Sequence, residues 1–219
     1  MPLDGPTFLA ALQARQSVRA FRPDPVERAV LERLFAAAVS APSPTNRQPW
    51  RFAVVTAASV RARVVEAVQA RVAEMGAIIE RGHHKDDFGR YGDFFHEPLA
   101  AAPVIVVPSY RSHTDLIAAL VRSGGGDPSA YDTSAAMQSE LCAAAAATMN
   151  LLNQAAAEGL GATWMAGPMV ARAEVEALVG IRAPFRMLGA VALGWPAEQP
   201  SPKPRRPLEQ VVTWLDAGD

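Results

Sequence analysis

The segment from Ser134 to Glu158 contains neither glycine nor proline, and its side chains are apolar or small on almost every side of a helix. A helix of this kind is normally buried all round, and one small sheet is not enough to cover it. The proline-rich tail from Trp195 onward also needs a surface to lie against. Together these features indicate an intertwined dimer, although both segments packing within one subunit remains an alternative.

Short apolar runs alternate with helical stretches, which indicates an α+β or α/β domain. Strands are predicted where apolar or β-branched residues run between turn residues, at residues 51–56, 104–107, 162–166 and 188–193. Helices are predicted from apolar side chains at helical spacing, at residues 7–16, 60–80 and 172–179 and from Asp24-Pro25 to before Pro42.

Two stretches lack a clear period. Residues 81–99 are polar with interspersed aromatics and predict a loop or broken helix, and residues 109–128 are expected to end irregularly. The tail is predicted to be extended, because prolines cannot continue a helix; they stand at Pro196, Pro200, Pro202, Pro204 and Pro207.

Composition excludes several classes of partner. The formal net charge of −1 gives no reason to expect nucleic acid or an anionic membrane. One cysteine, Cys142, cannot form an internal disulfide, so a reducing compartment is expected. No signal-peptide pattern stands at the start, and no stretch is apolar enough to span a bilayer. The sequence therefore predicts a cytoplasmic protein.

The first motif is Arg15-Gln16-Ser17-Val18-Arg19. Two guanidiniums four residues apart, with a hydroxyl between them, converge on one anion if the chain is helical or turning there. Arginine offers a planar fork of donors that suits phosphate oxygens. Alone, the motif is more typical of a solvated helix end.

The second motif runs from Ala41 to Trp50 and contains three prolines. A loop stiffened in this way loses little entropy on binding a ligand. Asn46 and Gln48 each offer a donor and an acceptor, which suits the edge of a heterocyclic ring. The alternative is an ordinary connection from helix to strand with a buried Trp50.

Two further motifs lie toward the C-terminus. Gly159 and Gly161 are expected to end the long helix in the left-handed cap conformation. After the next strand, Ala166-Gly167 lets the backbone approach a flat ligand closely, although helix capping and a turn explain part of this segment. The run Lys203-Pro204-Arg205-Arg206 places cations on a stiff chain, which is otherwise typical of a solubilising tail.

Other candidate sites carry little weight. Adjacent His83 and His84 diverge in most conformations, and no metal site is expected. Gly124 to Gly126 does not match a dinucleotide fingerprint. Ser112, His113 and Asp115 resemble triad residues but lie in one local stretch without a nucleophile elbow.

In this order the four motifs resemble the FMN-dependent nitroreductase family. They read Arg-x-Ser-x-Arg, then Ala-Pro-Ser-x-Thr-Asn-x-Gln-Pro-Trp, then a helix ending in Gly-Leu-Gly, then Lys-Pro-Arg-Arg-Pro-Leu-Glu. The resemblance implies an α+β fold with a central, mostly antiparallel sheet flanked by helices. It also implies an intertwined homodimer with two FMN sites at its interface. One domain would span residues 1–219, with a variable lid at about 81–128 and an extended arm at 196–219.

The resemblance assigns roles to the motif residues. Arg15 would bind the FMN phosphate, Gln16 and Ser17 would line the cofactor, and Arg19 would approach the pyrimidine side of the ring. The partner subunit's loop would cover the flavin edge with Pro42, Ser43, Pro44 and Asn46, supported by Gln48. Phosphate-binding cations would be Lys203 and Arg205, with Arg206 as a possible substitute. The backbone of Met165, Ala166 and Gly167 would lie near flavin N5.

The sequence departs from the family at two places. Many members have a glutamate where this chain has Ala166, but a backbone contact to N5 does not need that side chain. Some members contact the flavin through an asparagine and a lysine, and the nearest positions here are Phe94 and Glu97. Arg19 is then the main candidate for stabilising the negative charge of reduced flavin.

The implied activity is electron transfer from NAD(P)H through flavin N5 to a small electrophilic acceptor by a ping-pong mechanism. Acceptors of the family include nitroaromatics, quinones and enone-like compounds, and no protein residue needs to act as a nucleophile. Two alternatives remain: a dedicated dehydrogenase, dehalogenase or flavin-consuming enzyme, and a flavin-binding module without turnover.

Overall fold

A computed structural model describes residues 4–82, 88, 91–133, 135 and 137–215. Its centre is an antiparallel sheet in the order β1 (Trp50–Val55), β2 (Val104–Arg111), β5 (Ala190–Gly194) and β3 (Gly161–Met165). The four predicted strands are confirmed to within a few residues. Short strand β4 (Phe185–Met187), which also pairs with β2, was not predicted.

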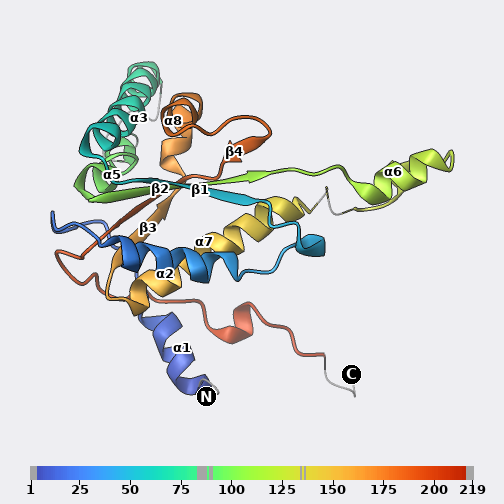
Figure 1. Cartoon of the computed structure of the whole chain (residues 1–219), viewed down its shortest axis with the longest axis horizontal. Coiled ribbons are helices and arrows are strands. Elements are labelled where there is room, and N and C mark those ends of the chain that lie inside the picture. Colours follow the sequence, from blue (N-terminus) through green and yellow to red (C-terminus); the bar gives the residue numbers. More distant parts are fainter. Residues whose placement is uncertain (1–3, 83–87, 89–90, 134, 136, 216–219) are drawn as a thin grey trace.

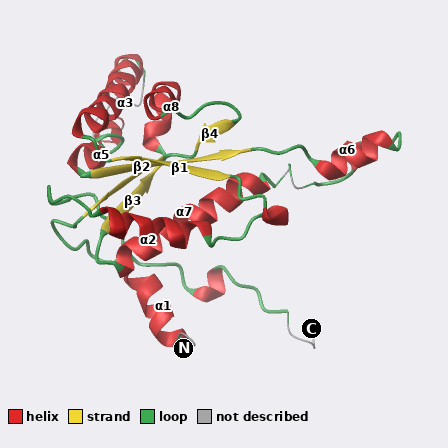
Figure 2. Cartoon of the chain, viewed as in Figure 1, coloured by secondary structure: helices red, strands yellow, loops and turns green. Residues whose placement is uncertain are grey.

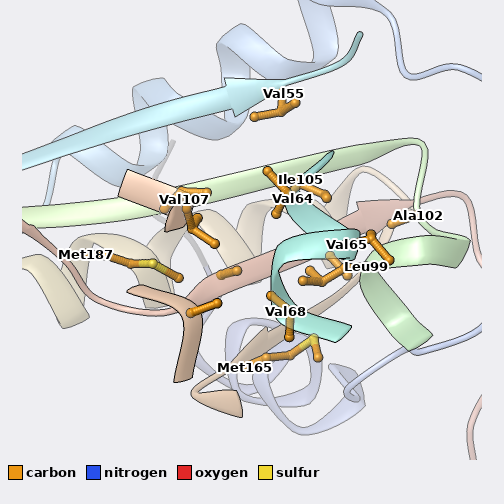
Figure 3. Close-up of a cluster of buried hydrophobic side chains, with 14 residues drawn as sticks. Val55, Val64, Val65, Val68, Leu99, Ala102, Ile105, Val107, Met165 and Met187 are labelled. Atoms are coloured by element: carbon orange, nitrogen blue, oxygen red, sulfur yellow. The ribbon is translucent and has the colours of Figure 1, made fainter. Parts of the chain in front are cut away.

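Helices cover both faces of this sheet (Figures 1 and 2). On one face lie α3 (Ala58–Ile79), α5 (Glu97–Ala101) and α8 (Arg172–Val179), and on the other α2 (Arg28–Val39) and α7 (Ser139–Ala157). The arrangement follows from strand β2, whose side chains alternate between the two faces. Its Ile105 and Val107 join the core under α3, shown in Figure 3, whereas Val104 and Val106 join the core under α2 and α7.

Two predicted helices begin later than expected. Helix α2 begins at Arg28 rather than at Asp24-Pro25, because Asp24 pairs with Arg22 instead of capping a helix and the carbonyl of Pro25 accepts a hydrogen bond from the Trp195 indole. Helix α7 begins at Ser139, and Ser134 and Ala136 of the predicted helix lie outside the described residues.

Within one chain helix α7 is buried on only part of its surface, as expected if one small sheet does not cover it. Its inner face is buried through Ala144, Ala147 and Leu151, whereas Cys142 and Ala157 on the opposite side are exposed. Its wall of small side chains lets α2 pack closely along it.

Helix α1 (Gly5–Ala14) is capped by Asp4, which accepts from the Thr7 amide, and ends before Arg15. Helix α6 (Leu116–Ser123), in the stretch expected to end irregularly, projects beyond the end of β2 (Figure 1). In the described part of the chain, no helix is both long and apolar enough to span a bilayer.

The C-terminal arm is extended, as predicted. Residues 195–197 run beside residues 20–22, and the chain then passes below α2 and α7 with a single 3-10 turn at Leu208–Gln210 (Figure 2). Its apolar side chains are exposed within one chain, at Leu208, Val211, Trp214 and Leu215.

Candidate functional site

The Arg15–Arg19 segment, here called the basic segment, is extended, not helical, and lies along the outer edge of β3. The Val18 amide donates to the Ala162 carbonyl at 3.1 Å, and Ser17 forms a parallel bridge with Ala162. Because alternate side chains of an extended chain share a face, a period of two would place Arg15, Ser17 and Arg19 on the face opposite the buried Val18. The sequence allowed a helix or a turn here, and the structure shows an extended segment instead.

Gly161 makes this close approach possible. A Cβ atom at Gly161 would lie 2.6 Å from the Cβ of Val18, a separation that real side chains essentially never show. Gly161 is thus the first residue of β3 and not a helix cap, which corrects that expectation. Gly159, with φ +77°, does take the left-handed cap conformation.

A cleft of about 720 Å³ opens between α1, the C-terminal half of α7 and Pro196. Arg15 and Gln16 border it, and its wall combines alanines, Phe8 and Leu12 with polar side chains that include Asn150, Asn153 and Gln154. Its volume is within the range of small-molecule sites. The basic segment therefore has open space beside it.

The arm starts beside the basic segment but does not stay there. The Arg22 amide donates to the Trp195 carbonyl at 2.8 Å, and the Ala197 amide donates to the Ala20 carbonyl at 3.0 Å. Beyond these two backbone hydrogen bonds, Lys203, Arg205 and Arg206 are exposed. They make no hydrogen bond or ion pair to any other described residue.

Strand β3 ends at Met165, and Ala166 and Gly167 follow it at the start of a 3-10 turn. Met165 is buried in the core, whereas Ala166 is exposed. A Cβ atom at Gly167 would lie 2.6 Å from the Phe95 ring, so this glycine makes room for Phe95 and was not recognised from the sequence in that role. Phe95 also packs edge to face with Tyr91 at 5.1 Å between ring centroids. Phe95 thus packs against the turn that follows β3.

The proline-rich loop adopts an unusual backbone. Thr45, Asn46 and Gln48 all have positive φ, at 48°, 54° and 46°. Such conformations of residues other than glycine cost roughly 1–3 kcal/mol each and persist where surrounding contacts hold them. Here the Ser43 hydroxyl accepts from the Gln48 amide at 3.0 Å, and the Gln48 side chain donates to Asn46 at 3.2 Å.

A polar cluster, here called the Glu140 cluster and consisting of Arg47, Arg111, His113 and Glu140, anchors this loop. The Arg47 guanidinium contacts the buried Glu140 carboxylate at 3.2 Å, and Nδ1 of His113 lies 3.7 Å from the same carboxylate. Arg111 donates to Nε2 of His113 at 3.2 Å. Nε2 of His113 is therefore occupied by Arg111, whereas Nδ1 lies near Glu140 without a hydrogen bond in the described structure. Asp115 caps α6, so these residues do not form a catalytic triad.

Burial lowers the pKa of His113, and the nearby cations Arg111 and Arg47 lower it further, against the opposing effect of Glu140. The imidazole therefore favours its neutral form in the folded chain. Sequence patterns gave no signal for the Glu140 cluster, because its members come from distant parts of the chain. Within the described residues no group of acidic, histidine or cysteine side chains is placed to hold a metal ion; His83 and His84 lie outside those residues.

The loop and the basic segment lie at opposite ends of α7. Arg47 binds Glu140 in the first turn of α7, while Ser17 pairs with Ala162, just beyond its last turn. Residues 140 and 157 are separated by roughly 25 Å at a helical rise of 1.5 Å per residue. One chain therefore does not bring the two predicted halves of the site together.

The family follows from a comparison with known sequences, in which a model of the nitroreductase family matches residues 12–195. The chain belongs to the nitroreductase family. The match includes the basic segment, the proline-rich loop and the end of β3, and the arm from Pro196 lies beyond it.

Two relatives of this nitroreductase family member are named for different activities. The chain is 32% identical over 213 residues to "NADH dehydrogenase" of Thermus thermophilus, with 94% of each chain covered. It is 27% identical over 202 residues to "5,6-dimethylbenzimidazole synthase" of Rhodospirillum rubrum, covering 90% of this chain and 88% of that protein.

Solved structures share the fold. A BluB-like flavoprotein from Clostridium difficile 630 superposes with a TM-score of 0.82 at 20% identity, covering 98% of this chain and all of that one. A nitroreductase with bound FMN from Desulfitobacterium hafniense DCB-2 has a TM-score of 0.68 at 18% identity, with 95% and 98% covered. The predicted nitroreductase-like α+β fold is thus confirmed.

Replacing Gly161 with alanine should displace the basic segment from β3. We expect Gly161→Ala to lower the free energy of unfolding by about 1–3 kcal/mol, since the added methyl overpacks against Val18. Urea unfolding measures this. Gly5→Ala is the control because a Cβ atom there meets nothing within 4 Å, and equal stability of both variants would contradict the close contact.

His113 should make stability depend on pH. Its pKa lies below the ordinary value of 6.5, so the unfolded chain takes up a proton before the folded chain does. The free energy of unfolding should therefore fall as the pH drops from 6.5 through the folded pKa. Urea unfolding across this range should show a flatter dependence for His113→Gln than for the wild type. Parallel curves would show that His113 does not titrate differently in the two states.

Proposed function

We propose that this protein is an FMN-dependent oxidoreductase that transfers electrons from NAD(P)H to a small electrophilic acceptor. The observation that carries the proposal is the extended Arg15–Arg19 segment paired with β3, whose period of two would place two guanidiniums and a hydroxyl on one face. Membership of the nitroreductase family and the FMN bound in a structural neighbour support it.

The donor set on the basic segment suits a phosphate. Arg15 and Ser17 would bind its oxygens through charge-assisted and hydroxyl hydrogen bonds, each charge-assisted bond contributing roughly 1.5–3 kcal/mol. Lys203 and Arg205 would add positive charge from the extended arm, with Arg206 next to them. Since these arm residues are free of other described contacts, binding a dianion would not require an existing ion pair to break.

FMN, when bound, would supply the hydride acceptor and donor of the reaction at its N5 atom. The end of β3 would hold this reactive edge through the backbone of Met165, Ala166 and Gly167. Gly167 begins a 3-10 turn, so its N–H has no partner within that turn. Arg19 would face the pyrimidine side and stabilise the negative charge that develops there. Gln16 would line the cofactor from the cleft beside α1.

A homodimer would complete the site. The loop residues Pro42, Ser43, Pro44, Asn46 and Gln48 lie a helix length away from the basic segment of their own chain, so they would serve the site of the partner. Two surfaces support an intertwined assembly. The apolar side chains of the arm from Leu208 to Leu215 are exposed within one chain. In the described sheet β1 has an unpaired outer edge, beside a groove lined in part by Phe35, Phe52 and Val54.

The catalytic cycle proposed is ping-pong: NAD(P)H and the acceptor occupy the same open face of the site in turn. Acceptors would be nitroaromatics, quinones or enone-like compounds. The chain positions the reactants and stabilises charge, and its side chains form no covalent bond with them. This division of labour is general for cofactor enzymes.

The second candidate is a dedicated enzyme of the same family. The relative named 5,6-dimethylbenzimidazole synthase favours it, as does the segment at 81–128, which resembles the family least. A generic nitroaromatic separates the candidates: turnover with NAD(P)H supports the first, and a reducible bound flavin without turnover supports the second. Bound FMN that no nicotinamide reduces would indicate a flavin-binding module.

Removing the Arg19 guanidinium should slow flavin reduction. We expect Arg19→Ala to lower the rate at which NADPH reduces bound FMN by at least about tenfold, as for the loss of one charge-assisted bond. Anaerobic stopped-flow absorbance measures the rate. Arg22→Ala, which removes an exposed arginine paired with Asp24, should keep the wild-type rate. An Arg19→Ala protein that retains its flavin and the wild-type rate of flavin reduction would contradict the role of Arg19.

Charges on the arm should separate the subunits without unfolding them. Val211 and Trp214 are 59% and 75% exposed in one chain, so the double variant Val211→Asp/Trp214→Asp costs little within that chain. In the proposed dimer the double variant would bury two carboxylates on each arm, which is costly. We therefore expect sedimentation velocity to show monomers, and FMN binding to be weaker. Ile78→Asp, at a position 56% exposed on α3, is the control. A dimeric arm variant would contradict the intertwined assembly.

A further inference from the structure

Glu140 is a buried carboxylate outside the set of residues assigned to the cofactor. It lies in the first turn of α7 with its side chain 9% exposed, and it contacts Arg47, whose side chain is 26% exposed. The Ser139 hydroxyl donates to its second oxygen at 3.1 Å. Since a buried charge is costly unless it is paired, Arg47 is held firmly to the start of α7.

Arg47 is placed where it controls the loop backbone. It stands between Asn46 and Gln48, which both have positive φ, and it follows Thr45, whose φ of 48° is unfavourable for a β-branched residue. Without an anchor these residues would relax toward ordinary conformations. The Arg47–Glu140 contact therefore holds Asn46 and Gln48 in a conformation that the sequence alone disfavours.

The other end of the loop is tied to the same cluster. The Pro49 carbonyl accepts from the Arg111 amide at 3.0 Å, and the Arg111 guanidinium donates to Nε2 of His113. A neutral His113 then carries its proton on Nδ1, which is buried and has no hydrogen-bond partner in the described structure except the approach to Glu140 at 3.7 Å. Loop, strand β2 and helix α7 thus meet at one carboxylate.

We propose that Glu140 is a positioning residue for the cofactor site: through Arg47 it holds the proline-rich loop in the conformation that covers the flavin of the partner subunit. This inference rests on the proposed function, because it takes the flavin as what the loop covers. The physical effect is preorganisation, in which a binding loop already fixed in its bound form loses less entropy when the ligand arrives.

The test compares Glu140→Gln with a matched control on the same helix. Glu158 lies at the other end of α7 and accepts two hydrogen bonds from Arg33 at 2.7 Å, so Glu158→Gln also removes one Arg–Glu pair, but far from the loop. FMN is titrated into each apoprotein by calorimetry, and sedimentation velocity reports the subunit assembly. We expect Glu140→Gln to weaken FMN binding by about tenfold or more with the dimer retained, and Glu158→Gln to stay within about twofold.

A double-mutant cycle shows whether Glu140 acts through Arg47. In Arg47→Gln/Glu140→Gln no charge of the pair is left unpartnered, so this protein is expected to fold even if a single variant does not. If the carboxylate acts only by fixing Arg47, the double variant binds FMN as weakly as either single variant, and the effects are not additive. A purely structural role would lower stability without this coupling in FMN affinity.

The outcomes separate the inference from the function beneath it. A wild-type protein that does not bind FMN overturns both. A wild-type protein that binds FMN, with Glu140→Gln or the double variant binding as tightly as Glu158→Gln, overturns only the positioning role. Equal and additive losses from Arg47 and Glu140 also overturn it, because the two residues would then act separately.

Discussion

The contact between Val18 and Gly161 determines where the predicted site can form. It lets the Arg15–Arg19 segment pack directly against the edge of β3, where the Val18 amide donates a hydrogen bond to the Ala162 carbonyl. With Val18 turned inward, the neighbouring Ser17 and Arg19 must face outward. The donor groups are thus directed by a backbone contact and a missing methyl group rather than by interactions of their own.

The two halves of the site differ in how they are held. The basic segment is fixed by strand-like backbone pairing, which suits an extended chain with donors on one face. The proline-rich loop is fixed by side chains, through the Glu140 cluster and the Ser43 hydroxyl. Because α7 separates these predicted halves within one chain, the proposed function needs a second subunit to bring the other half of each site.

Sequence periodicity predicted the sheet and most helices because each buried run had to face a core on at least one side. It failed where local rules compete with contacts between distant residues. Asp24-Pro25 has the composition of a helix start, yet the Trp195 indole uses the Pro25 carbonyl. Strand β4 is too short to show a period, and only its pairing with β2 defines it.

The motif residues were found from their order along the chain, but their geometry was not. Arg15 and Arg19 were expected to converge through a helix or a turn, and the structure shows them in an extended segment instead. Glu140 could not be found, since a glutamate at the start of a helix is ordinary until Arg47 and His113 are seen beside it. From the sequence, Gly167 predicted a close approach to the backbone, but it did not reveal that the Phe95 ring occupies this space.

Strand β2 supplies alternate side chains to both hydrophobic cores, Val104 and Val106 to one and Ile105 and Val107 to the other. Loss of its pairing would expose both clusters to water at once, so the two layers of helices are coupled through this strand. Such a shared strand favours a single cooperative transition. The basic segment and the loop, although far apart, therefore keep or lose their supports together.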